Sequence, residues 1–179
     1  MIRKLHHNAY RCRDSEQTRA FYEGFLGLPL AETLEIGETK SGRATQTLHT
    51  FYQLDDGSFP AFFEAPDMPF EFKDQHDFDL HIALEVDRAA LETMLAKGKA
   101  CAIETRGVSN HGFIDSIYFR DPNGYVIELC AKREGHDAAM DPASNGARGR
   151  LQRWTAAKER ATRNRPPGNT GSLRSARTS

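Results

Sequence analysis

The order of hydrophobic and polar positions along the chain repeats once within the first 131 residues. Alternating and apolar runs predict strands, and apolar residues three or four positions apart predict a helix. In the first copy we expect a strand over 5–13, a helix over 16–26, and strands over 30–36, 45–54 and 60–65. In the second copy we expect a strand over 80–86, a helix over 89–96, and strands over 102–106, 114–120 and 125–131. Each copy is therefore a strand, a helix and three strands, which predicts an α+β fold.

Short polar segments mark where these elements begin and end. Asp14 is a suitable N-cap for the first helix, and Gly27 and Gly98 are placed to end the first and second helices. The segments 55–58 (Asp-Asp-Gly-Ser) and 121–124 (Asp-Pro-Asn-Gly) are rich in turn-forming residues and precede the last strand of each copy. The sequence thus predicts one domain over 1–134 that contains two βαβββ modules, at about 4–65 and 80–131.

The remaining residues, 135–179, differ from this body in charge. They contain nine Arg and Lys against three Asp and Glu, so the tail carries a net charge of +6 and the body one of −7. The tail has one aromatic residue, Trp154, and too few hydrophobic residues to form a core. We expect a short helix over 151–160 followed by a disordered end. Because no aromatic residues are interspersed among the basic ones, we expect a solvated tail and no nucleic-acid partner.

Composition argues against two further classes of protein. No apolar run approaches the ~20 residues that a membrane span needs, and the first residues contain no apolar signal core. Three scattered cysteines are too few for a disulfide framework or a thiolate metal cluster. We therefore expect a cytoplasmic protein without a membrane partner.

The first strands of the two modules carry matched histidines. Residues 7–9 (His-Asn-Ala) match residues 81–83 (His-Ile-Ala). Because alternate side chains of a strand point to the same face, each histidine shares a face with a small alanine. The last strands match as well, because 62–64 and 126–128 each end in a glutamate among apolar neighbours. An unpaired charge in apolar surroundings is costly, whereas a divalent metal accepts both imidazole nitrogens and a carboxylate. The pattern predicts a metal site.

Two longer segments resemble those of a known family. The first helix ends in 20–28 (Ala-Phe-Tyr-Glu-Gly-Phe-Leu-Gly-Leu), and 118–129 reads Tyr-Phe-Arg-Asp-Pro-Asn-Gly-Tyr-Val-Ile-Glu-Leu. Residues 4–132 thereby resemble the vicinal oxygen chelate (VOC) superfamily, which includes glyoxalases, bleomycin-resistance proteins and extradiol dioxygenases. The resemblance implies that the two modules form a cupped mixed sheet around a metal. The implied metal ligands are His7, His81 and Glu128.

The segment from Asn110 to Glu128 also resembles the signature of extradiol dioxygenases, except that Ser109 stands two positions before the histidine. The resemblance implies that His111 and Tyr118 line a catechol pocket beside Fe(II), where His111 transfers protons and Tyr118 hydrogen-bonds a substrate oxygen. Two histidines and one carboxylate leave coordination positions for a catecholate and dioxygen. The sequence therefore predicts a metal-dependent dioxygenase that opens a catechol-like ring next to its vicinal hydroxyls.

Two other functions are compatible with the same fold. In glyoxalase-type members a carboxylate of the first module completes a four-ligand site, and Glu64 is the candidate here. Such an enzyme would be an isomerase or lyase that uses Ni, Zn, Mn or Co. Bleomycin-resistance members instead bind a drug without catalysis. In each case the partner is a small molecule.

Two other histidines of the first module are also candidates for the site. His6 is the alternative ligand to His7, but it would lie on the opposite face of its strand. His49 shares a strand face with Phe51 and is a candidate for a second acid or base.

Related proteins pair their modules within or between chains, so the resemblance implies a homodimer.

Overall fold

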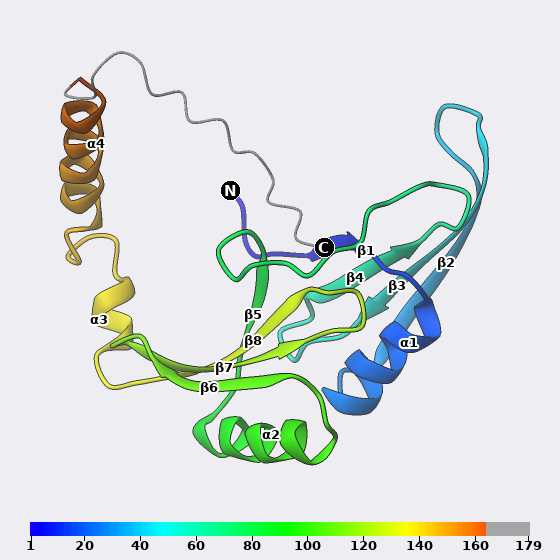
Figure 1. Cartoon of the computed structure of the whole chain (residues 1–179), viewed down its shortest axis with the longest axis horizontal. Helices are drawn as coiled ribbons and strands as arrows, with labels where there is room; N and C mark the ends of the chain where they lie inside the picture. The colour runs from blue at the N-terminus through cyan, green and yellow to red at the C-terminus, as the bar shows by residue number, and fades with distance from the viewer. Residues whose placement is uncertain (164–179) are drawn as a thin grey trace, which may run out of the picture. The chain divides into compact units, whose positions relative to one another are not determined.

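Two βαβββ modules follow one another in the chain, of which a computed structural model describes residues 1–163 (Figure 1). The first module contains β1 (His7–Arg11), α1 (Ser15–Arg19), the π-helical segment η1 (Ala20–Phe25), β2 (Leu30–Glu38), β3 (Ala44–Tyr52) and β4 (Phe59–Glu64). The second module contains β5 (His81–Glu85), α2 (Arg88–Ala100), β6 (Thr105–Asn110), β7 (Ile114–Arg120) and β8 (Val126–Lys132). The α+β fold predicted from the repeat is confirmed.

Each module forms its own four-stranded mixed sheet. The strand orders are β1-β4-β3-β2 and β5-β8-β7-β6. In each sheet the first and last strands of the module are parallel, and the other pairs are antiparallel. The strands that begin with the two matched histidines, β1 and β5, are therefore edge strands, whereas β4 and β8 are internal.

One hydrophobic core joins the two sheets through the first helical segment. Tyr22 is fully buried and stacks on Tyr52 of the first sheet, with ring centroids 5.3 Å apart. Phe25 packs edge-on against Phe119 of the second sheet at 5.1 Å. The Tyr22 hydroxyl also donates to the Asp121 carboxylate across the modules, at 3.1 Å. Both sheets thus turn one face to the shared core and leave the other face outside it.

The first helical segment begins and ends as the sequence predicts, but α2 does not. Asp14 caps α1 by accepting from the backbone N–H of Gln17, and Gly27 follows η1 with a positive φ of 84°. Gly98 was expected to end the second helix, yet α2 runs on to Ala100. A Cβ at Gly98 would lie 2.5 Å from the Phe119 ring. The glycine is required by this close helix-to-sheet contact and not by a helix end.

The strand after α2 also begins later than predicted. Ala102 has a left-handed φ of 53°, and the N–H of Ile103 bonds back to the carbonyl of Gly98. The chain is therefore still completing the helix end where a strand over 102–106 was expected, and β6 starts only at Thr105.

The chain divides into one unit over Met1–Glu134 and a second over Gly135–Ser179. In the second unit, α3 spans His136–Met140 and α4 spans Ala147–Arg163, so α4 is longer at both ends than the predicted helix over 151–160. The end that we expected to be disordered lies outside the described residues. Among residues 1–163, no helix is long and apolar enough to cross a membrane, and the three cysteines are unpaired.

Candidate functional site

Strand pairing places several predicted site residues on one face of the second sheet. Ala83 of β5 lies opposite Glu128 of β8, and Glu128 lies opposite Tyr118 of β7. Residues that pair across neighbouring strands point to the same face, and His81 shares that face with Ala83 two residues on. Ile127, with the opposite orientation, belongs to the core. His81, Glu128 and Tyr118 therefore share the face that is turned away from the core.

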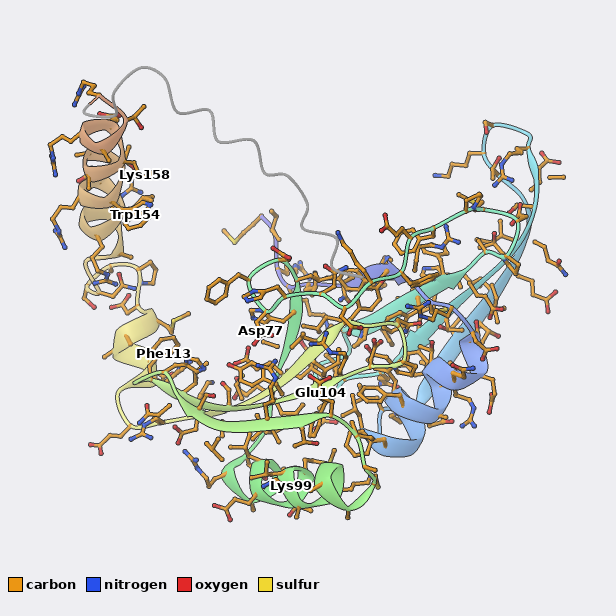
Figure 2. All side chains as sticks on the ribbon, in the orientation of Figure 1. Asp77, Lys99, Glu104, Phe113, Trp154 and Lys158 are labelled. Carbon is orange, nitrogen blue, oxygen red and sulfur yellow. The ribbon has the colours of Figure 1, made fainter. Side chains whose placement is uncertain are left out.

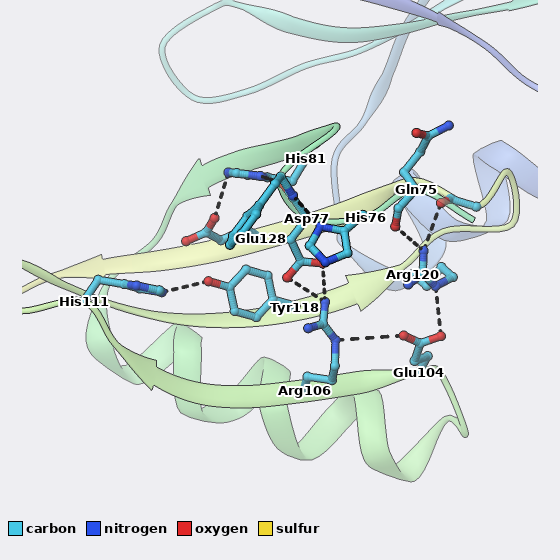
Figure 3. Close-up of polar contacts among 12 residues, drawn as sticks. Gln75, His76, Asp77, His81, Glu104, Arg106, His111, Tyr118, Arg120 and Glu128 are labelled. Atoms are coloured by element: carbon cyan, nitrogen blue, oxygen red, sulfur yellow. Dashed lines mark hydrogen bonds and ion pairs between the residues drawn. The ribbon is translucent and has the colours of Figure 1, made fainter. Parts of the chain in front are cut away.

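His81 and Glu128 lie beside one another on this face (Figure 3). The Nε2 atom of His81 lies 3.2 Å from Oε2 of Glu128. On the other side of the ring, Nδ1 lies 2.6 Å from the backbone carbonyl of Asp77. Because a carbonyl only accepts, Nδ1 donates this hydrogen bond, which leaves Nε2 as the candidate metal-binding nitrogen. The backbone of Asp77 thus turns Nε2 of His81 toward the carboxylate.

A hydrogen bond to the other carboxylate oxygen, Oε1, fixes the side chain of Glu128. Its side chain is 6% exposed, against 40% for His81, and its Oε1 accepts a 2.5 Å hydrogen bond from the hydroxyl of buried Ser116. Oε2 remains directed at His81. A nitrogen lone pair and a carboxylate oxygen that converge in this way are the donor set of a divalent metal. The donor chemistry of the His81–Glu128 pair therefore fits the metal that the sequence predicts.

His111 and Tyr118 lie beside this pair and contact one another. The Tyr118 hydroxyl is 2.8 Å from Nε2 of His111. Burial, and secondly the charge of Glu128, raise the pKa of Tyr118, so its hydroxyl keeps its proton at neutral pH and can donate to the imidazole. The structure therefore brings together four of the five residues that the dioxygenase resemblance implies: His81, Glu128, His111 and Tyr118.

Two residues that support the site, Asp77 of the inter-module segment and Ser116 of β7, were not singled out from the sequence. The Asp77 carboxylate binds one guanidinium nitrogen of Arg106 through both oxygens, at 2.8 and 3.0 Å, and the Arg106 guanidinium lies 5.0 Å from the centre of the Tyr118 ring. Asp77 thus contacts His81 through its backbone carbonyl and Arg106, which lies beside Tyr118, through its carboxylate, as Figure 3 shows. No sequence pattern indicates a role for a backbone carbonyl. Ser116 could have been found, because it is a polar residue two positions before Tyr118 on a buried strand.

The corresponding face of the first sheet has different chemistry. His7 lies within ring-contact distance of His49 and Phe51, with centroids 6.1 and 5.5 Å away. His49 is buried, bonds the carbonyl of Phe62 through Nδ1, and has its pKa lowered by burial. His49 and Phe51 share a face, as their alternation predicts. Ala61 occupies the position that Glu128 has in the second sheet, so His7 has no carboxylate opposite it.

The predicted correspondence between 62–64 and 126–128 is wrong. His7 pairs with Phe59 and His81 pairs with Val126, so Ala61, and not Glu64, corresponds to Glu128. An offset of three residues reverses the face of a strand. Glu64 therefore points to the helix side, where Oε2 accepts a 2.7 Å hydrogen bond from the backbone N–H of Ser15 at the start of α1. In this position its carboxylate stabilises a helix end.

His7 does not join the His81–Glu128 pair within one chain. Among residues 1–163, no group of three or more His, Cys, Asp or Glu side chains is close enough to hold a metal ion together. His7 instead contacts His6, with their Nδ1 atoms 2.8 Å apart. One chain thus presents two of the three predicted ligands at one place and the third on a different sheet.

Comparison with known proteins gives a family match over most of the body. Residues 4–129 match the model of the Glyoxalase/Bleomycin resistance protein/Dioxygenase superfamily. A glyoxylase/bleomycin resistance protein/dioxygenase domain from Frankia sp. EAN1pec is 17% identical, with a TM-score of 0.60, over 76% of this chain and 96% of that one. A glyoxalase/dioxygenase from Nostoc punctiforme is 24% identical, with a TM-score of 0.55, over 74% and 92% of the two chains.

A third solved structure is of a mutant of the fosfomycin resistance protein FosX from Listeria monocytogenes, complexed with Mn(II) and 1S,2S-dihydroxypropylphosphonic acid. It is 19% identical, with a TM-score of 0.58, over 77% of this chain and 99% of that one. At such identities, these structures establish the likeness of fold. None of the curated proteins matches the chain.

Proposed function

The chain belongs to the glyoxalase/bleomycin resistance protein/dioxygenase superfamily, and from this premise we propose that it is a metal-dependent extradiol dioxygenase. The substrate would be a catechol-like ring, opened next to its two vicinal hydroxyls. The observation that carries the proposal is the 2.8 Å contact of His111 with Tyr118 on the sheet face of the His81–Glu128 pair. Proton transfer at a substrate hydroxyl needs such an imidazole and phenol beside the metal.

The ligand set supports a dioxygenase over a glyoxalase-type isomerase. Nε2 of His81 and Oε2 of Glu128 would hold the metal, with an imidazole of His7 as third ligand. A bound Fe(II) would supply open positions for both substrate oxygens and dioxygen. Glu64, the fourth ligand that an isomerase would need, is bonded to the N–H of Ser15 on the other side of its sheet. FosX, of similar fold, is complexed with a divalent metal and a vicinal diol.

His7 would come from a second copy of the chain. β1 and β5 are both edge strands, and His7 and His81 are both exposed on faces turned away from the core. A two-fold axis that brings β1 of one copy beside β5 of the other would unite the three ligands and would form two equal sites. The proposed enzyme is therefore a homodimer whose sites each need both chains.

Each residue of the proposed site then has its own role in binding the substrate or orienting the metal ligands. Nε2 of His111 accepts the proton of a substrate hydroxyl placed next to Tyr118. The Tyr118 hydroxyl, kept protonated by its raised pKa, donates a hydrogen bond to the same oxygen. Ser116 and the Asp77 carbonyl keep Glu128 and His81 in their ligating orientations.

The first test measures metal content and oxygen uptake on anaerobically purified protein. With catechol or 2,3-dihydroxybiphenyl, we expect about one iron per chain, oxygen consumption and a yellow ring-opened product. His81→Ala should lose the metal, and Asp79→Asn, a nearby exposed change, should retain it. Bound Mn or Ni without oxygen uptake would instead favour a non-oxidative reaction, and wild-type protein without stoichiometric metal would leave a binding protein.

Subunit mixing tests the origin of His7. His7→Ala and His81→Ala should each be inactive alone. If each site uses both chains, dissociating and mixing the two variants in equal amounts restores one intact site in every mixed dimer, or about a quarter of all sites. If His7 and His81 of the same chain form the site, mixing restores nothing, because every site then contains one altered ligand.

A further inference from the structure

Helix α4 is the most strongly charged element of the described chain. Its 17 residues include a single acidic side chain, Glu159, and six basic ones. The basic residues are Arg148, Arg150, Arg153, Lys158, Arg160 and Arg163. All six are exposed, and so are Leu151 and Trp154, at 65% and 64%. Figure 2 shows Trp154 and Lys158 projecting from the helix one turn apart.

These basic groups are not neutralised within the described residues. Elsewhere in residues 1–163 many arginines pair with carboxylates, as Arg19 does with Glu16 and Glu23. None of the six basic residues of α4 has a carboxylate within ion-pair distance in the same part of the chain. Their one side-chain hydrogen bond runs from Arg150 to the carbonyl of Asn145. A helix with a net charge of +5 and no internal partner is suited to a polyanion.

The distribution of the charges distinguishes between polyanions. At about 100° per residue, the five arginines spread over an arc of roughly 200° around the helix, and on the remaining side Lys158 lies between Trp154 and Leu151 and interrupts the apolar face. A bilayer contacts one side of a helix and favours a continuous apolar face there. A nucleic-acid groove surrounds a helix and places phosphates on both sides of it. Five of the six residues are arginines, whose planar guanidinium groups match phosphate oxygens in pairs.

We propose that α4 is a nucleic-acid-binding element that inserts between the phosphates of a double-stranded groove. The arginines bind phosphate oxygens, and the exposed Trp154 ring contacts sugars and bases. The body carries a net charge of −7 and repels the same ligand, so binding is confined to the second unit. The sequence alone predicted a solvated tail. The unpaired charges around a continuous helix of 17 residues change that expectation.

The test uses the full chain and does not depend on metal or catalysis. Trp154 is the only tryptophan of the protein, so its fluorescence reports on α4 alone. Titration with a labelled 20-base-pair DNA duplex or an RNA hairpin at 50 mM NaCl should change this fluorescence, with a micromolar Kd. The logarithm of affinity should fall with the logarithm of salt concentration, by about 0.9 for each phosphate contacted. The stronger of the two nucleic acids identifies the ligand.

A matched pair of variants locates the binding. Replacing Arg148, Arg153 and Arg160 by Gln, a good helix former, should weaken binding at least ~10-fold and reduce the salt slope by about 3, with unchanged circular dichroism. Replacing three exposed lysines of the body, Lys40, Lys73 and Lys99, by Gln should change neither the affinity nor the salt slope.

Three results would overturn the proposal. The first is equal weakening by both triple variants, and the second is no change in Trp154 fluorescence with either nucleic acid up to ~100 μM, far above the expected Kd. The third is a response to phosphatidylglycerol vesicles, or to a second copy of the chain, in place of nucleic acid.

Discussion

The two modules have the same topology and the same histidine at the start of the first strand, but only the second module places a carboxylate beside it. His81 faces Glu128 at 3.2 Å, whereas His7 faces His49 and Phe51, with Ala61 at the position of the glutamate. The difference shows that a duplicated scaffold does not duplicate its chemistry. One sheet presents a histidine among other rings without a carboxylate, and the other presents a histidine with a carboxylate and a phenol–imidazole pair.

Replacing the glutamates of the two last strands, Glu64 and Glu128, tests this difference between the modules with the largest expected effect. Glu128→Gln alters a proposed ligand, and because changes even to groups behind a ligand weaken metal binding by 10–100-fold, we expect a loss of at least ~100-fold in metal affinity. Glu64→Gln should leave metal affinity unchanged and lower the unfolding free energy by about 1 kcal/mol, since it weakens the bond to Ser15 at the start of α1. Calorimetric metal titration and urea unfolding check both variants.

An unchanged metal affinity in Glu128→Gln would contradict the assignment of the site to the second sheet. A loss of metal in Glu64→Gln would mean that the glutamate leaves Ser15 and that the first sheet supplies a carboxylate after all.

The phenol–imidazole contact provides the next largest effect. Tyr118→Phe removes the hydroxyl that contacts His111 and should lower the turnover number about 100-fold while metal content stays the same. Tyr10→Phe makes the same change on the first strand of the other module, where the ring packs against Phe62 and Tyr125. It should leave turnover unchanged. Equal rates in both variants would remove Tyr118 from the reaction.

Two helical glycines have different surroundings, because Gly98 of α2 faces the second sheet whereas Gly24 of η1 is exposed. Gly98→Ala in α2 should cost about 1–3 kcal/mol of unfolding free energy, because the added Cβ overlaps the Phe119 ring and the Thr105 hydroxyl. Gly24→Ala in η1 meets no atom within 4 Å and should stabilise the protein by up to about 1 kcal/mol. Thermal and urea unfolding measure both, and a stabilised Gly98→Ala would disprove the close approach.

A smaller expected effect is the change with pH in the stability that Asp115 gives to the second module. Arg88 and Arg133 both bind the Asp115 carboxylate, at 2.6 and 2.9 Å, and the Arg88 bond foremost holds the pKa of Asp115 below its ordinary value. The stabilisation by ionised Asp115 is complete above the unfolded pKa of about 3.9 and is lost as pH falls through the lower folded pKa. Asp115→Asn should therefore lower the urea midpoint equally from pH 5 to 8, and the difference from the parent should shrink below pH 4. A constant difference down to pH 2 would contradict this.

Local patterns in the sequence predict most of the fold. Apolar alternation, the cap at Asp14 and the turn residues at 121–124 act over a few neighbouring positions, and the structure contains every predicted strand and helix of the two modules. The errors occur where a distant contact overrides a local preference. Gly98 has a residue type that ends helices, yet it continues α2 because Phe119 leaves no room for a side chain there.

The twofold repeat, its element order and the residue types suited to a metal follow from the sequence, because they depend on spacing along the chain. Which carboxylate lies beside a histidine depends instead on how the strands pair in three dimensions. Strand register is fixed by hydrogen bonds between strands far apart in sequence, and a shift of three residues put Glu64 on the helix side and Ala61 opposite the position of Glu128. The packing of both sheets on one core likewise set His7 apart from the His81–Glu128 pair, since each sheet turns its histidine away from that core.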